Sequence, residues 1–232
     1  SILPRSSLGS AVRRSNSKMA ELHYYGAQGR GQQIRYALAE GGVEWKDCSA
    51  SFPPSDEVKA KWTALGGNLT TNVPMLIMDG KAYTQSSAVL RHAARKGGLM
   101  PSDPELQYQV DNIIAAVDDY RTAAYKPIFA AFGGSPDAEA NAQLKDVVLP
   151  KHFTNFERLL GDDDYFVGNQ VSVADMTAFD IFTNFSFNLF PSTKKDFPKL
   201  AAFVDRIASR PNMAAYLASD KYTSLMAFPC LE

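Results

Sequence analysis

Between Met19 and Lys96 the sequence alternates between strand patterns and helix patterns, and this order restricts the possible folds more than any other feature of the chain. The spacing of apolar residues assigns each segment, and paired glycines end the helices. Asp79 and Gly80 form the strongest hairpin signal in the sequence. In the order strand, helix, strand, helix, strand, strand, helix, the expected segments are 21–25, 32–40, 43–51, 56–65, 73–78, 81–84 and 86–96.

This order combines a crossover unit with a hairpin. A crossover through a helix joins parallel strands, whereas a tight turn joins antiparallel ones. A short β-α-β-α-β-β-α chain of this kind is the order of the thioredoxin fold. We therefore expect an α/β thioredoxin-like domain over residues 19–97.

The rest of the chain has only helical periodicity. A turn-rich linker over 98–103 ends at Asp103, which precedes Pro104 as a helix cap precedes a first helical residue. Ser172 and Asp175 have the spacing of a capping box. We expect an all-α domain over 104–232, with a helix after Asp103 and further helices near 139–160, 172–188, 197–209 and 212–219.

The first 18 residues differ from the rest in charge. They hold Arg5, Arg13, Arg14 and Lys18 and no acid, so they carry +4 against −5 for the remainder. Serine-rich, arginine-rich and acid-poor sequence is typical of a transit peptide, and an expression remnant would look the same. We expect residues 1–18 to lie outside the fold. The expected location is cytoplasmic, or an organelle if this arm is a transit peptide.

Charge and composition exclude several classes of function. A net charge of −1 gives no field that would hold nucleic acid or an anionic membrane. No apolar run approaches the ~20 residues of a membrane span. Cys48 and Cys230 lie too far apart for a paired-cysteine motif, which predicts neither a disulfide scaffold nor a zinc cluster. The expected partners are therefore small molecules, with no metal.

The first candidate site is the turn after the first expected strand, where Tyr24 and Tyr25 precede Gly-Ala-Gln-Gly-Arg30-Gly-Gln-Gln-Ile-Arg35. A strand-to-helix turn presents side chains at an edge, and a helix N-terminus favours anions. Adjacent residues of a strand point to opposite faces, so we expect one of the two tyrosines to be in the core.

Two further turns are candidates. Pro74 opens a strand, and a cis bond there would expose the backbone of Val73 for pairing with an extended peptide, although only about 5% of such bonds are cis. At the second turn, Ser86 or Ser87 is expected to cap a helix whose N-terminus favours a carboxylate. Gln85 precedes these serines.

Together, the order and spacing of these motifs resemble those of the cytosolic glutathione transferases over about residues 19–220, and are closest to the tyrosine-type mu and sigma classes. The resemblance implies a thioredoxin-like domain followed by an all-α domain, glutathione as co-substrate, and a homodimer. It implies conjugation of glutathione to small hydrophobic electrophiles. The alternatives are a glutathione-dependent isomerase similar to prostaglandin D synthase, and a non-catalytic ligand-binding or crystallin-like protein.

The resemblance also implies roles for single residues. Tyr24 takes the place of the catalytic tyrosine that stabilises the glutathione thiolate, and Asp119 that of an aspartate reaching the partner subunit's glutathione. Tyr125 and Phe129, with Phe132, would form an apolar wall if they continue the helix of Asp119. The other positions that match the glutathione site are Tyr25, Arg30, Asn72, Val73, Pro74, Gln85 and Ser86.

Two regions depart from the family pattern. The Trp and Lys that usually meet the glycyl carboxylate align only with a gap, and Trp62 and Lys61 are the candidates for them. Gln28 stands where an arginine is common.

Overall fold

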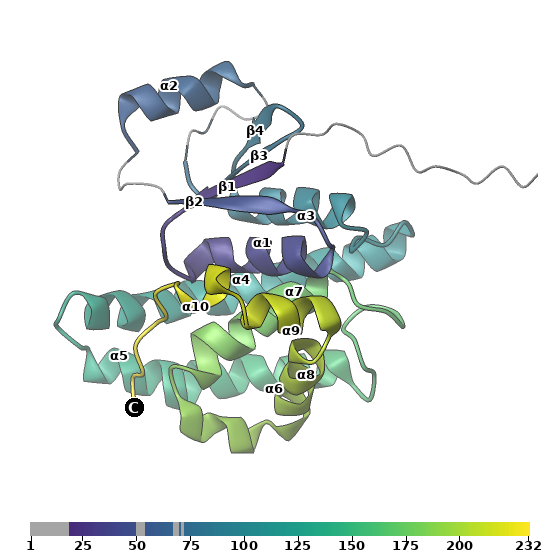
Figure 1. Ribbon diagram of the computed structural model, residues 1–232. Helices are drawn as coiled ribbons and strands as arrows, with labels where there is room; N and C mark the ends of the chain where they lie inside the picture. The colour runs from purple at the N-terminus through teal and green to yellow at the C-terminus, as the bar shows by residue number, and fades with distance from the viewer. Residues whose placement is uncertain (1–18, 50–53, 67–69, 71) are drawn as a thin grey trace, which may run out of the picture.

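The computed structural model describes residues 19–49, 54–66, 70 and 72–232, so the expected N-terminal arm, residues 1–18, lies outside the described residues. The first half of the described chain contains three helices and four strands (Figure 1). In chain order they are β1 Ala20–Tyr24, α1 Gly29–Glu40, β2 Trp45–Ser49, α2 Asp56–Ala64, β3 Met75–Met78, β4 Lys81–Tyr83 and α3 Ser86–Lys96.

The strands form one mixed sheet in the order β2-β1-β3-β4. β1 pairs in parallel with β2, and β3 runs antiparallel to both β1 and β4. Asp79 and Gly80 both have positive φ, at 51° and 77°, as the expected hairpin turn requires. Helices α1 and α3 cover one face of the sheet, and α2 lies on the opposite side (Figure 1). This is the expected thioredoxin-like arrangement.

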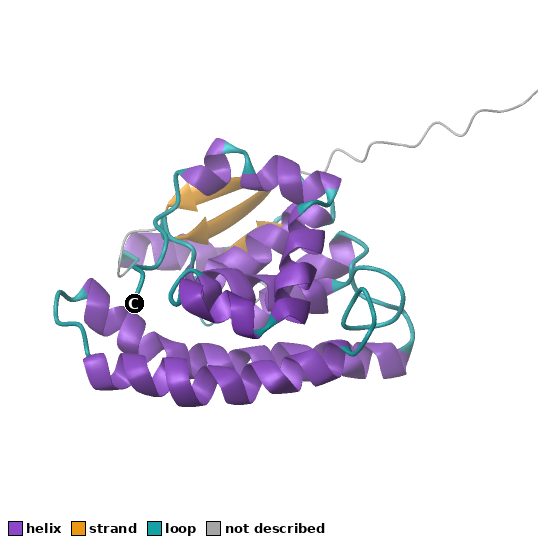
Figure 2. Cartoon of the chain, turned by 90° about the horizontal axis from the view of Figure 1, so that it is seen from below, coloured by secondary structure: helices purple, strands orange, loops and turns teal. Residues whose placement is uncertain are grey.

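The second half of the described chain is helical (Figure 2). Its longest helix continues through Pro127. Among the described residues, no helix has both the length and the apolar character needed to cross a membrane. The elements are α4 Pro104–Phe132, α5 Ala138–Gln143, the π turn η1 Leu144–Val148, α6 Leu149–Leu160, α7 Val173–Phe182, the π turn η2 Thr183–Phe187, the 3₁₀ turn η3 Pro191–Asp196, α8 Pro198–Ala208, α9 Pro211–Leu217 and α10 Asp220–Thr223.

The expected helix at 139–160 is interrupted by a π turn, and the one at 172–188 ends in a π turn. At the first of them, Pro150 has no N–H to donate to the carbonyl of Asp146, and the wide turn η1 ends at Val148, two residues before this proline. The capping box expected at the start of α7 is present. The Ser172 side chain accepts a backbone N–H of the first helical turn, and the Asp175 side chain accepts the backbone N–H of Ser172.

One hydrophobic core extends through both halves of the described chain. The ring of Tyr36 in α1 lies 5.0 Å, edge to face, from that of Phe179 in α7. Asn184 Nδ2 donates to the Tyr36 hydroxyl over 3.2 Å, and Arg121 donates to Gln33 Oε1 over 3.1 Å. Helix α1 is thereby fixed between the sheet and the helical half.

Candidate active site at the turn between β1 and α1

Tyr24, the last residue of β1, places its hydroxyl at the N-terminus of α1. The hydroxyl oxygen accepts the backbone N–H of Arg30 over 2.9 Å. The first N–H groups of a helix have no partner within it, and the residue before α1, Gln28, supplies no side-chain cap. Tyr24 therefore provides one hydrogen bond that the helix end needs.

The glycines on either side of Arg30 make room for this ring. A Cβ at Gly31 would overlap the ring atoms of Tyr24, and one at Gly29 would lie 2.5 Å from its hydroxyl oxygen. Gly29 also has φ of +37°, in the region that favours glycine. The Gly-Arg-Gly spacing thus allows the helix to begin directly beneath the tyrosine.

Burial raises the pKa of the Tyr24 hydroxyl above its ordinary value of 10.0. The Arg30 N–H and the charges of Arg35 and Arg30 oppose this effect without overcoming it. The phenol therefore keeps its proton at neutral pH. Because the oxygen accepts from Arg30, its own O–H is left to donate to an anion in front of the helix.

Arg35 holds the turn between β1 and α1 in place. Its guanidinium donates to the carbonyl oxygens of Ala27 and Tyr25 over 2.9 and 3.2 Å, and to Asp47 on β2 over 2.9 Å. It also lies 5.7 Å from the centre of the Tyr24 ring. No role for this arginine was predicted from the sequence, although it ends the motif that follows the tyrosines.

Tyr24 is the one of the two tyrosines that lies in the core, as expected, whereas Tyr25 is only partly buried. Their ring centres are 5.0 Å apart and both rings line one cavity. The two rings lie side by side, and not on opposite faces, because β1 ends at Tyr24, so the alternation of a strand does not extend to Tyr25.

The cavity beside Tyr24 has a volume of about 590 Å³ and is mainly apolar. Helix α4 continues unbroken from Asp119, so Tyr125 and Phe129 reach the cavity together, with their rings stacked at 5.2 Å. The guanidinium of Arg30 lies 5.3 Å from the centre of the Tyr125 ring. The lining residues are Tyr24, Tyr25, Ala27, Gly29, Arg30, Tyr125, Phe129, Phe132, Met226 and Phe228.

The C-terminal segment supplies part of this wall. Met226 N–H donates to the carbonyl of Gly26 over 2.9 Å, and its own carbonyl accepts from Gln28 N–H over 3.1 Å. Phe228 packs against Phe185 at 4.8 Å between ring centres. Met226 and Phe228 were not predicted from the sequence, because isolated apolar residues have no spacing that points to a distant turn.

A second, more polar cavity of about 430 Å³ is lined by Arg30, which also lines the apolar cavity. The two cavities therefore meet at this side chain. The bond between Val73 and Pro74 is cis, so the expectation of a trans bond from frequency was wrong. The lining residues are Arg30, Asn72, Val73, Pro74, Gln85, Ser86, Ser87 and Asp118.

Neither serine caps helix α3, contrary to expectation. Gln85 occupies the cap position with φ of 71° and makes no side-chain capping bond, and Ser86 is the first helical residue. The hydroxyl of Ser87 instead donates to Asp118 Oδ2 over 2.8 Å. The N-terminus of α3 thus faces the polar cavity without a side-chain cap, which suits a carboxylate ligand.

Asp118, and not its neighbour Asp119, lines the polar cavity. Its carboxylate accepts from Arg30 over 3.4 Å and from the buried Arg121 over 2.5 Å, as well as from Ser87. Asp119 lies on the exposed face of α4. Helical spacing would have found Asp118, because it follows the buried Ile114 by four residues.

Family models match both halves of the chain. The model described as glutathione S-transferase, N-terminal domain, matches residues 20–95, and the C-terminal domain model matches residues 118–220. Glutathione S-transferase P of Bos taurus is 32% identical over 86% of this chain and 91% of its own length. The chain belongs to the glutathione S-transferase family.

Other glutathione S-transferases have similar sequences and folds. The alpha I enzyme of Oryctolagus cuniculus is 30% identical over 84% of this chain and 86% of its own length. Among solved structures, the glutathione S-transferase of Ascaris lumbricoides has a TM-score of 0.70 at 25% identity, and covers 87% of this chain and 97% of its own. NaGST-2 has the same TM-score at 24% identity, covering 87% and 96%.

Two of the residues expected at the glutathione S-transferase site lie apart from both cavities. Trp62 of α2 is buried against the sheet, in contact with Met75 and Ala82. Lys61 is exposed and pairs with Glu57 over 2.7 Å. Neither lines either cavity.

Proposed function

We propose that this transferase joins the thiolate of glutathione to small apolar electrophiles, with Tyr24 stabilising the thiolate. The observation that carries the proposal is the Tyr24 hydroxyl, which accepts from Arg30 and keeps a proton to donate beside two adjoining cavities. One cavity is polar enough for a charged peptide, and the other is lined by aromatic rings. Their contact at Arg30 brings thiol and electrophile to one place.

The energy of one such hydrogen bond is sufficient. A free thiol with pKa near 8.5 is only slightly ionised at neutral pH, yet the thiolate is the nucleophile. A hydrogen bond to a charged group contributes about 1.5 to 3 kcal/mol, which lowers a pKa by about one to two units. The positive charge of Arg30 and the N-terminus of α1 act in the same direction.

The polar cavity suggests how glutathione is held. We propose that the backbone of Val73, between Asn72 and the cis Pro74, pairs with the cysteinyl unit. Gln85 and Ser86, at the uncapped start of α3, would receive the γ-glutamyl carboxylate. Tyr25 would line the same peptide. Trp62 and Lys61 have no support as partners of the glycyl carboxylate, since both lie outside the cavity.

The apolar cavity would hold the second substrate against Tyr125 and Phe129. Stacked rings 5.2 Å apart offer a flat apolar surface, and its position beside Tyr24 sets the electrophilic atom near the thiolate. This arrangement favours flat, apolar electrophiles. No observation favours the isomerase or the non-catalytic alternative over conjugation.

We further propose a homodimer in which Asp119 reaches the partner's glutathione. The support is that this carboxylate is exposed on α4 while its neighbour Asp118 is occupied within the chain. A tyrosine-type enzyme is part of the same proposal. Membership of the mu or sigma class stays a prediction, because the curated relatives named above are P and alpha enzymes. The domain division at 19–97, 98–103 and 104–232 and the cytoplasmic location also stay predictions.

The decisive experiment compares Tyr24→Phe with Tyr108→Phe. The control removes a hydroxyl from an exposed ring on α4, away from both cavities. Thiolate absorbance of bound glutathione gives the thiol pKa, and turnover is measured with a general aromatic electrophile. Tyr24→Phe should raise the thiol pKa by about one to two units and lower kcat. Tyr108→Phe should change neither.

An unchanged thiol pKa and full turnover in Tyr24→Phe would remove Tyr24 from the mechanism. Turnover by the wild type with an endoperoxide alone would favour the isomerase. Glutathione binding without any turnover would favour the non-catalytic alternative.

A further inference from the structure

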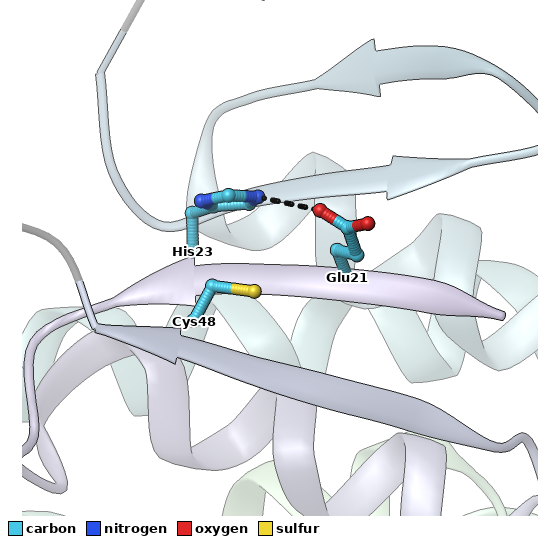
Figure 3. A group of neighbouring side chains, drawn as sticks. All are labelled: Glu21, His23 and Cys48. Atoms are coloured by element: carbon cyan, nitrogen blue, oxygen red, sulfur yellow. Dashed lines mark hydrogen bonds and ion pairs between the residues drawn. The ribbon is translucent and has the colours of Figure 1, made fainter. Parts of the chain in front are cut away.

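Three side chains with metal-binding atoms meet on the sheet face that α2 covers. Glu21 and His23 are two residues apart on β1 and so point to the same face. The parallel register places Cys48 of β2 directly beside His23. Figure 3 shows the three side chains rising from one face of the two strands. The spacing of the two cysteines predicted no zinc cluster, but the register supplies a histidine and a carboxylate to one of them.

The distances suit a small ion. The nearest ligand atoms of the three side chains all lie within 4.8 Å of one another, and His23 Nε2 is 3.2 Å from Glu21 Oε2 (Figure 3). In a tetrahedral zinc site with bonds of about 2.0 to 2.3 Å, neighbouring ligand atoms are roughly 3.3 to 3.6 Å apart. The His23 to Glu21 distance is already close to this value. Rotation of the Cys48 side chain would bring its sulfur to a similar distance from the other two ligand atoms.

The surroundings hold the His23 ring in place and leave the site open to solvent. The His23 ring packs edge to face on Trp62 of α2, with ring centres 5.5 Å apart. The side chains of His23 and Glu21 are 18% and 45% exposed, so an ion and a water molecule can reach them. None of the three ligands lines the cavities beside Tyr24.

Few other residues of this chain could compete for the ion. The sequence has three histidines and two cysteines, and residues 1–18 contain none of them and no acid. Within the described residues, no other group of three such side chains is close enough to share an ion. Burial and the charge of Glu21 raise the pKa of the Cys48 thiol, so this thiol is not an activated nucleophile.

We propose that Glu21, His23 and Cys48 bind one Zn²⁺ ion, with water as the fourth ligand. Thiolate, imidazole and carboxylate are all ligands that zinc accepts, and three protein ligands leave one position open. Binding forms a bond from zinc to Cys48 Sγ and releases the thiol proton to solvent. The ion would tie the edge strand β2 to β1. The site is independent of the proposed transfer reaction.

The test uses Co²⁺ as a spectroscopic probe for the zinc site, added to the full chain without glutathione, which itself binds metals. Thiolate ligation gives a sulfur-to-cobalt charge-transfer band, and a four-coordinate ion gives intense visible bands. The wild type and Cys230→Ser should show both at one equivalent, and added Zn²⁺ should abolish them. Cys48→Ser should lose the charge-transfer band and bind Zn²⁺ more than about tenfold more weakly, since loss of even an indirect contact to a metal ligand costs that much.

A second pair of variants tests the histidine. His23→Gln should weaken Zn²⁺ binding, whereas His92→Gln, on α3, should not. Zn²⁺ should also raise the midpoint of thermal unfolding of the wild type and not that of Cys48→Ser. Retained glutathione conjugation shows that each variant is folded. Absence of saturable binding in the wild type, or an unchanged cobalt spectrum in Cys48→Ser, would overturn the proposal.

Discussion

At the scale of single residues, the Tyr24 hydroxyl serves two neighbours at once. It accepts a hydrogen bond from the start of α1, and in the proposed mechanism it donates one to the thiolate. Both bonds depend on the ring lying flat on the first turn of α1. The position of the ring depends in turn on the absence of a side chain at Gly31.

We expect Gly31→Ala to reduce activity although alanine is the better helix former by about 1 kcal/mol. The new methyl group would overlap the Tyr24 ring and displace the hydroxyl, and a shift of about 1 Å can reduce catalysis by about 100-fold. The measurement is kcat/KM with glutathione and an aromatic electrophile. Gly26→Ala is the matched control, because a Cβ there meets nothing within 4 Å. Equal kcat/KM in the two variants would contradict this account.

The two adjacent aspartates of α4 should respond differently to substitution. Asp118→Asn removes the charge between Arg30 and the buried Arg121, and should lower the free energy of unfolding by about 1 to 3 kcal/mol. Asp119→Asn should leave that free energy unchanged and raise the KM for glutathione if the carboxylate reaches a partner subunit. Urea unfolding and steady-state kinetics measure the two effects. A stability loss confined to Asp119→Asn would reverse the assignment.

The sequence identified residues whose roles depend on local context, and missed those set by tertiary contacts. Tyr24, Arg30 and Gln85 stand at turns between elements, where a motif and an exposed edge coincide. Met226 reaches the site only because the C-terminal segment folds back on Gly26. No role was predicted for Asp118, although helical phase places it on the buried side of α4.

At the scale of elements, strand and helix positions were predicted well because turn residues mark their ends. Asp79 and Gly80 predicted the hairpin turn, and the spacing of Ser172 and Asp175 predicted the start of α7. The π turns η1 and η2 were not predicted, because one extra residue in a turn barely disturbs the apolar pattern. Elements follow from local signals, whereas the width of a single turn does not show in the apolar pattern.

The capping box of α7 gives a pH-dependent contribution to stability. Burial raises the pKa of Asp175 from 3.8 to about 6, although backbone N–H groups of Phe166 and Ser172 oppose the shift. Because the folded pKa is the higher one, this group stabilises the fold fully below about pH 4, and the contribution is lost as the pH rises to about 6.

Asp175→Asn should therefore remove one component of the pH profile. The free energy of unfolding of the wild type minus that of the variant should fall by about 3 kcal/mol between about pH 4 and 6, at about 1.4 kcal/mol per pKa unit. Urea unfolding at several pH values measures this difference. A difference that rises with pH over this range would mean that the hydrogen bonds outweigh burial and that the folded pKa is lowered.

At the scale of the whole molecule, the main core of the described chain is continuous through both halves, and a smaller cluster of Trp62, Met75 and Ala82 lies where α2 packs on the sheet. The order of elements predicted the two halves, and the family models match each of them. The contacts of α1 with α4 and α7 could not be predicted, since nothing in the sequence marks which faces of distant helices meet. The apolar cavity arises from this packing and from the C-terminal segment.

A chain that ends after Leu225 should lose affinity for the apolar substrate. It lacks Met226 and Phe228, so the cavity beside Tyr24 opens on one side and less apolar surface of the electrophile is buried. The KM for the electrophile should rise several-fold, with a smaller change for glutathione. A chain that ends after Phe228 keeps both wall residues and is the control. A rise confined to the KM for glutathione would place the segment at the other cavity.

The hydrogen bonds between Met226 and the turn of Gly26 and Gln28 also affect when the enzyme can become active during its synthesis. The ribosome adds Met226 about two hundred residues after Tyr24. Even if the thioredoxin-like half has already folded, a nascent chain carries an incomplete pocket until Met226 and Phe228 have left the exit tunnel. Electrophile turnover is therefore restricted to chains whose synthesis has passed Phe228.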